Sequence, residues 1–233
     1  MLKCLRKIRR KAYEVRKFIP SMRERHELEK MVGPLGYWDE LQAYQLRALT
    51  ANGLKPDQCL LDLGCGPLQG GVGFINYLDK GRYVGVDVST RNLTAAYGQI
   101  SRHKLCEKNP RLIYSTNFGL EETKGYLFDY LWTSQILYYF DDEMIKKYYE
   151  LIVSRMAATG KTLGDIIGKN HPEYGNRGKS DFLRNIQLHT VDALERLADP
   201  FGLKVRPLGE IAQYGYPARL SLRTNTMLEI TKK

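Results

Sequence analysis

The chain has 233 residues, of which 43% are hydrophobic and 27% charged, with a net charge of +10. This composition suits one globular domain with a short appendage and argues against a disordered chain. It contains no apolar run near the roughly 20 residues of a membrane-spanning helix. The charged N-terminal segment lacks the apolar core of a secretory signal, so we expect a cytoplasmic protein.

The positive charge is concentrated at the N-terminus. Residues 1–30 contain eleven Lys or Arg against four Glu, so they carry +7 of the net +10. The remaining 203 residues carry only +3, which leaves no excess for following a phosphate backbone. The pattern therefore disfavours nucleic acid as a partner of the main domain.

Residues 1–31 are predicted to form a basic, amphipathic helical arm, which Pro20 breaks or kinks. Two roles stay open for this arm. It can dock on its own domain or on a second subunit of an oligomer, or it can lie on the anionic inner face of a membrane. The apolar stripe of the arm consists of Leu5, Ile8, Ala12, Val15, Ile19 and Met22.

The four cysteines show no C-x-x-C spacing, which disfavours a zinc site or a disulfide framework and favours reduced thiols. They are Cys4, Cys59, Cys65 and Cys106.

After a Gly-Pro-Leu-Gly break at 33–36, residues 32–233 are predicted to form a single domain in which short apolar strands alternate with helices. This order predicts a doubly wound α/β fold, with a mostly parallel seven-stranded sheet, an antiparallel C-terminal strand and helices on both faces. The expected strands cover 59–63, 83–88, 112–115, 128–133, 161–167, 203–208 and 226–231, and the expected helices 37–52, 70–78, 92–108, 143–156 and 191–198.

The segment LLDLGCGPLQGG at 60–71 ends a predicted strand and opens a helix. Glycines there allow a sharp turn and a close approach of a ligand to the backbone. The pyrophosphate fingerprint G-x-G-x-x-G is not met, because Gly64 and Gly66 are followed by Gly70, one place late. Asp62 precedes the turn, and this carboxylate suits a cationic ligand and repels a pyrophosphate. Asp87 ends the next strand, where an acid can bind ribose hydroxyls.

These motifs, with YVGVDVS at 83–89 and FDYLWTSQIL at 128–137, resemble class I S-adenosylmethionine-dependent methyltransferases. The resemblance covers about residues 60–156. It implies S-adenosylmethionine as methyl donor and S-adenosylhomocysteine as product. GYWDELQAYQLRAL at 36–49 is similar to a helix that helps to cover the cofactor in some of these enzymes. The cofactor-binding residues that the resemblance implies are Tyr37, Asp62, Gly64, Gly66, Gly71, Asp87, Val88, Asn117, Phe118 and Ser134.

The polar segment 168–190 follows the fifth strand and is predicted to act as a substrate lid. Within it, His171 is the candidate catalytic base, and Arg177 and Lys179 could meet an anionic group. Tyr138 and Tyr139 replace a His-His pair of related enzymes, and we interpret them as packing or substrate-lining groups. The acids Asp141-Asp142 are interpreted as a helix N-cap and not as a metal site.

The favoured function is methylation of a hydroxyl on a small molecule or glycan. Two alternatives stay open: a methyltransferase acting on nucleic acid or protein, and a non-catalytic S-adenosylmethionine-binding subunit. A dinucleotide-dependent dehydrogenase is a more distant alternative, because the glycine spacing departs from that fingerprint.

Overall fold

A computed structural model describes residues 23–171 and 186–233, within two compact units, Met1–Trp38 and Asp39–Lys233. In the first unit a helix covers 23–32 and ends before Gly33, as the sequence predicts. Glu29 closes the following turn by accepting the Gly36 N–H at 2.9 Å. The rest of the predicted arm, including Pro20, lies outside the described residues.

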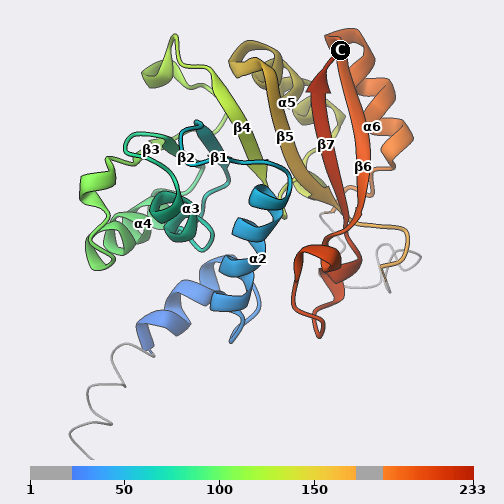
Figure 1. Ribbon diagram of the computed structural model, residues 1–233. Coiled ribbons are helices and arrows are strands. Elements are labelled where there is room, and N and C mark those ends of the chain that lie inside the picture. Colours follow the sequence, from blue (N-terminus) through green and yellow to red (C-terminus); the bar gives the residue numbers. More distant parts are fainter. Residues whose placement is uncertain (1–22, 172–185) are drawn as a thin grey trace, which may run out of the picture. The chain divides into compact units, whose positions relative to one another are not determined.

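The second unit contains a seven-stranded sheet with the order β3-β2-β1-β4-β5-β7-β6. Figure 1 shows the strands side by side in this order. Neighbouring strands from β3 to β5 are parallel, whereas β7 is antiparallel to both β5 and β6. The predicted fold class is therefore confirmed. The strands are β1 Leu60–Leu63, β2 Tyr83–Asp87, β3 Arg111–Tyr114, β4 Phe128–Thr133, β5 Met156–Ile166, β6 Leu203–Glu210 and β7 Thr226–Lys232.

Among residues 38–171 and 186–233, five α-helices connect the strands or precede β1. They are α2 Trp38–Ala51, α3 Gly71–Tyr77, α4 Thr90–Arg102, α5 Asp142–Arg155 and α6 Val191–Ala198. Short 3-10 helices are η1 Cys106–Lys108, η2 Glu121–Thr123, η3 Leu137–Tyr139, η4 Asp199–Phe201, η5 Ile211–Tyr214 and η6 Ser221–Thr224. Asp141 caps α5 by accepting the Met144 N–H at 2.8 Å, which confirms its interpretation as an N-cap.

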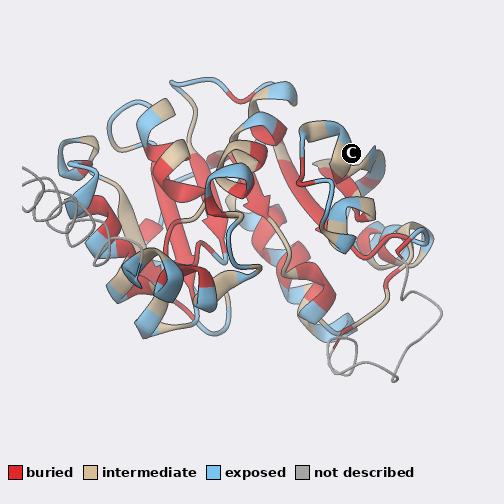
Figure 2. Cartoon of the chain, turned by 90° about the horizontal axis from the view of Figure 1, so that it is seen from below, coloured by how far each residue is buried: buried red, intermediate tan, exposed pale blue. Residues whose placement is uncertain are grey.

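Adjacent residues of β4 point to opposite faces of the sheet and show that both faces are covered. Leu131 belongs to the main core together with residues of α5 and α6. Trp132 points the other way, where its indole N–H donates to Gln45 of α2 at 3.0 Å and its ring meets Phe74 of α3. Buried positions accordingly gather along the strands and on the helix sides that face them (Figure 2).

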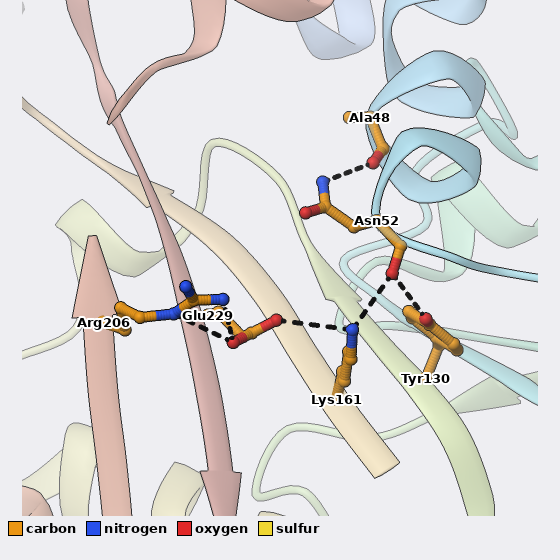
Figure 3. Close-up of polar contacts among 6 residues, drawn as sticks. All are labelled: Ala48, Asn52, Tyr130, Lys161, Arg206 and Glu229. Atoms are coloured by element: carbon orange, nitrogen blue, oxygen red, sulfur yellow. Dashed lines mark hydrogen bonds and ion pairs between the residues drawn. The ribbon is translucent and has the colours of Figure 1, made fainter. Parts of the chain in front are cut away.

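The C-terminal end of α2 is tied to the sheet through one carbonyl group (Figure 3). The backbone oxygen of Asn52 accepts the Tyr130 hydroxyl at 2.7 Å and the Lys161 ammonium at 3.3 Å. A cation at the end of a helix also interacts favourably with the helix dipole. Lys161 lies 3.7 Å from Glu229, which in turn pairs with Arg206 at 2.7 Å.

Two element boundaries differ from the sequence prediction by more than two residues. β5 begins at Met156 and not at 161, because Met156 pairs with Phe128 of β4 across a register shift between Phe128 and Tyr130. The predicted helix 92–108 ends at Arg102, since Lys104 takes a left-handed conformation with φ of 56°. No helix among residues 23–171 and 186–233 is long and apolar enough to cross a membrane.

Candidate functional site

The loop after β1 turns through the left-handed region at two glycines. Gly64 has φ of 79° and Gly66 has φ of 53°, values that favour glycine. A Cβ at Gly64 would lie 3.0 Å from the Ile136 side chain. A Cβ at Gly71 would lie 2.7 Å from the Tyr83 hydroxyl, so this glycine lets the start of α3 pack closely on the sheet.

Asp87 joins this loop to the end of β2. Its Oδ2 accepts the Gly66 N–H at 2.9 Å, and its Oδ1 accepts the Ser89 N–H at 2.8 Å and the Asn92 amide at 3.1 Å. A carboxylate offers about four accepting positions, so three donors leave capacity for a further one. The structure thus places the two predicted motifs in direct contact at the carboxyl end of the parallel strands.

Asp62 is buried and accepts the Tyr83 hydroxyl at 2.7 Å. Burial raises the pKa of this carboxyl to about 7, while the bond from Tyr83 lowers it and the charge of Asp87 raises it further. No described ion pair compensates the Asp62 charge. A cationic ligand group beside the loop would relieve this cost, whereas a phosphate would increase it.

The remaining predicted cofactor residues have different surroundings. Val88, directly after Asp87, exposes 65% of its surface. The Asn117 carboxamide closes its own turn by accepting the Gly119 N–H at 3.1 Å. The Phe118 ring packs on Phe140 at 5.6 Å between centroids. Ser134 is half-buried at the carboxyl end of β4.

Tyr37 belongs to the first unit, where it is half-buried. His171 is buried, with its backbone N–H bonded to the Gly168 carbonyl at 2.9 Å. Residues 172–185 of the predicted lid, including Arg177 and Lys179, lie outside the described residues.

Tyr138 is buried and Tyr139 is 55% exposed, with ring centroids 4.8 Å apart. Tyr138 also packs with Ile167, which directly precedes the predicted lid, and with Ile186, which lies within it. Packing is therefore its observed role.

The sequence reasoning did not single out Asp165, a fully buried acid at the carboxyl end of β5. It lies next to the end of β4 and accepts hydrogen bonds from Gln135 and Asn225. The available signal was a lone acid inside the apolar run LGDII at 163–167, since a buried carboxylate needs dedicated donors.

No protein-family model matches the chain, and no curated protein sequence matches it. Solved structures do match. Magnesium protoporphyrin IX methyltransferase from Synechocystis PCC 6803, with bound S-adenosylhomocysteine, superposes with a TM-score of 0.64 at 13% identity, covering 84% of each chain. A glycopeptide N-methyltransferase complexed with sinefungin gives 0.63 at 13% identity, over 82% of this chain and 94% of that one.

An O-methyltransferase from neocarzinostatin biosynthesis, in complex with S-adenosylmethionine and 2-hydroxy-5-methyl naphthoic acid, gives a TM-score of 0.59 at 16% identity. The match covers 89% of this chain and 55% of that one. These similarities agree with the strand order, the antiparallel β7 and the glycine turn after β1. The chain therefore has the fold of the class I S-adenosylmethionine-dependent methyltransferases.

Proposed function

We propose that the chain is an S-adenosylmethionine-dependent methyltransferase. The observation that carries this proposal is the contact between the two motifs, in which the Gly66 N–H meets the Asp87 carboxylate beside the left-handed turn at Gly64. The nearby buried Asp62 supports a cationic cofactor over a dinucleotide. When bound, S-adenosylmethionine supplies a methyl group on a positively charged sulfur and leaves as S-adenosylhomocysteine.

Different residues of this chain would contact different parts of the cofactor. The backbone at Gly64, Gly66 and Gly71 and the Asp62 carboxylate would hold the methionine portion, and Asp87 would hold the ribose. The exposed Val88 side chain offers an apolar surface to the adenine. The other residues proposed to contact the cofactor are Tyr37, Asn117, Phe118 and Ser134.

We infer a hydroxyl acceptor on a small molecule or glycan. The near-neutral main domain and the short polar segment 168–190 support this class, and the neighbours include an enzyme of natural-product O-methylation. A hydroxyl benefits from a general base at hydrogen-bond distance, and His171 is proposed for this role.

The experiment is transfer of tritiated methyl from S-adenosylmethionine to panels of phenols, sugars, peptides and RNA. Alkali-stable label on phenols or sugars is expected. Loss of about 100-fold or more in kcat for His171→Gln is expected of a missing general base. His103→Gln, which changes an exposed histidine, is the matched control. Label only on RNA or peptide would favour the macromolecular alternative, and cofactor binding without transfer to any acceptor would favour the non-catalytic subunit.

The predicted arm carries a separate proposal about location. A cytoplasmic enzyme whose residues 1–30 hold a +7 charge would bind the anionic inner face of a membrane. Flotation with vesicles containing phosphatidylserine should recover the full chain and not a chain lacking residues 1–30. Equal recovery would favour the other role, docking on the domain or in an oligomer.

A further inference from the structure

A buried polar cluster surrounds Asp165 at the carboxyl end of β5, next to the end of β4. Asp165 is fully buried, and β5 places it directly after Gly164, which pairs with Thr133 at the end of β4. Among residues 23–171 and 186–233 it forms no ion pair. Its carboxylate therefore depends on hydrogen bonds for compensation.

The carboxylate divides its two oxygens between two elements. Oδ1 accepts the backbone N–H of Gln135, just after β4, at 2.8 Å. Oδ2 accepts the side-chain amide of Asn225, just before β7, at 2.7 Å. Burial raises the pKa of Asp165 to about 6, and the bonds from Asn225, Gln135 and Ser134 lower it, so the group is mostly ionised at pH 7. The titratable groups that face it are the hydroxyls of Tyr44, Tyr138 and Tyr216.

Gln135, whose N–H is bound by Asp165 Oδ1, has an unfavourable backbone conformation. Gln135 has φ of 58°, in the left-handed region that residues with a Cβ rarely adopt. In this conformation its carboxamide donates to the Tyr216 hydroxyl at 2.7 Å. The charged hydrogen bond from its own N–H offsets the cost of the conformation. Asp165 thereby determines the path of the chain at Ser134 and Gln135.

The cluster also contains a polar atom that is left unpaired. Asn225 Oδ1 is buried without a hydrogen-bond partner among the described residues. Burial and the nearby charge of Asp165 raise the pKa of the Tyr44 hydroxyl, and an interaction with Ser134 lowers it. An unpaired buried atom and a strained residue together reduce stability, and such features gather at functional sites.

We propose that Asp165 is a positioning residue, which holds Ser134 and Gln135 in the conformation that receives the cofactor at the end of β4. This inference rests on the proposed function. Without Asp165, the left-handed conformation of Gln135 would become a minor state. The apparent affinity for the cofactor would then fall in proportion to the fraction of molecules in this conformation. A glycine at 135 adopts the same conformation without Cβ strain.

The test compares S-adenosylhomocysteine affinity by calorimetry across full-length variants. Asp165→Ala is expected to weaken binding about tenfold, the population loss that left-handed strain at one residue implies. Adding Gln135→Gly to Asp165→Ala is expected to restore most of that loss. Tyr216→Phe controls for the side-chain bond that Gln135→Gly also removes, and Leu163→Ala, a buried change on the same strand, controls for lost stability. Both controls should bind within about threefold of the wild type, a change under 1 kcal/mol.

Amide hydrogen exchange without ligand gives a second readout. Asp165→Ala should speed exchange at Gln135 and leave the Leu60–Leu63 strand protected. Should this variant fail to fold, Asp165→Asn keeps the shape, and a smaller loss, again reversed by Gln135→Gly, is expected. The inference is overturned if Asp165→Ala binds S-adenosylhomocysteine as tightly as the wild type, or if Leu163→Ala loses as much affinity. It is also overturned if Gln135→Gly does not reverse the loss. Failure of the wild-type chain to bind S-adenosylhomocysteine overturns the proposed function instead.

Discussion

Asp62 and Tyr83 form a buried hydrogen-bonded pair between β1 and β2, 2.7 Å apart. With a pKa of about 7 in the fold and about 4 in an unfolded chain, the carboxyl is protonated in the folded state over the intervening pH range. The unfolded chain releases this proton first, so the stability of the ligand-free protein falls as the pH rises from about 4 to about 7.

Asp62→Asn removes this pH-dependent cost. We expect the free energy of unfolding of the variant, relative to that of the wild type, to be about 1–3 kcal/mol higher at pH 8 than at pH 5. Each unit by which folding shifts the Asp62 pKa is worth about 1.4 kcal/mol. Urea unfolding at both pH values measures the difference. A stability difference that is the same at pH 5 and pH 8 would show that Asp62 ionises normally in the fold.

Gly64 and Gly81 form a matched pair for testing the glycine turn. Their φ values are 79° and 77°, but a Cβ at Gly64 would meet Ile136 at 3.0 Å, whereas a Cβ at Gly81 would meet nothing within 4 Å. An alanine at either position should cost about 1–2 kcal/mol from left-handed strain. Only Gly64→Ala should also weaken S-adenosylhomocysteine binding. Equal affinity of the two variants for S-adenosylhomocysteine would show that the Gly64 turn is not part of the binding site.

At the scale of elements, α2 depends on the Asn52 carbonyl for its attachment to the sheet (Figure 3). Tyr130→Phe removes one of the two donors to this carbonyl and keeps the ring. We expect a loss of about 1 kcal/mol, typical of one hydrogen bond, and a Tm lower by about 2–4 °C. Calorimetric melting measures it, with the exposed Tyr97→Phe as control. A Tm equal to that of the control would show that Lys161 alone holds the helix end.

The positions of the strands along the chain were predictable because parallel strands buried on both faces are continuous apolar runs of characteristic length. Phe128–Thr133 and Val191–Ala198 match their predicted bounds. The start of β5 was not predictable, because Met156 continues the apolar pattern of the preceding helix and the small residues at 157–160 form no apolar run. They belong to a strand because Met156 pairs with Phe128. Pairing between neighbouring strands, and not local composition, decides such boundaries.

The glycine turn and Asp87 were predictable because their residue types are required locally by the turn and by the end of a strand. The Asp165 cluster was not, since Asn225 lies 60 residues away and meets Asp165 only when β7 inserts beside β5. Sequence resemblance also assigned Phe118 to the cofactor, while the structure packs its ring on Phe140 and Tyr148. Its proposed cofactor contact remains a prediction.

The whole molecule combines a methyltransferase fold, two linked acid motifs at one sheet edge and a basic N-terminal sequence. We propose that this edge binds S-adenosylmethionine and not a dinucleotide. Asp62 and the late third glycine carry the distinction, because the Asp62 carboxylate would repel a pyrophosphate and the glycine spacing departs from the dinucleotide fingerprint.

Isothermal titration of the full chain with S-adenosylhomocysteine and, separately, with NAD tests this claim most directly. We predict saturable binding of S-adenosylhomocysteine at one site per chain and no binding of NAD. Asp87→Ala should weaken the binding of S-adenosylhomocysteine at least about tenfold, because hydrogen bonds to a charged group are lost. Saturable binding of NAD without binding of S-adenosylhomocysteine would contradict the claim.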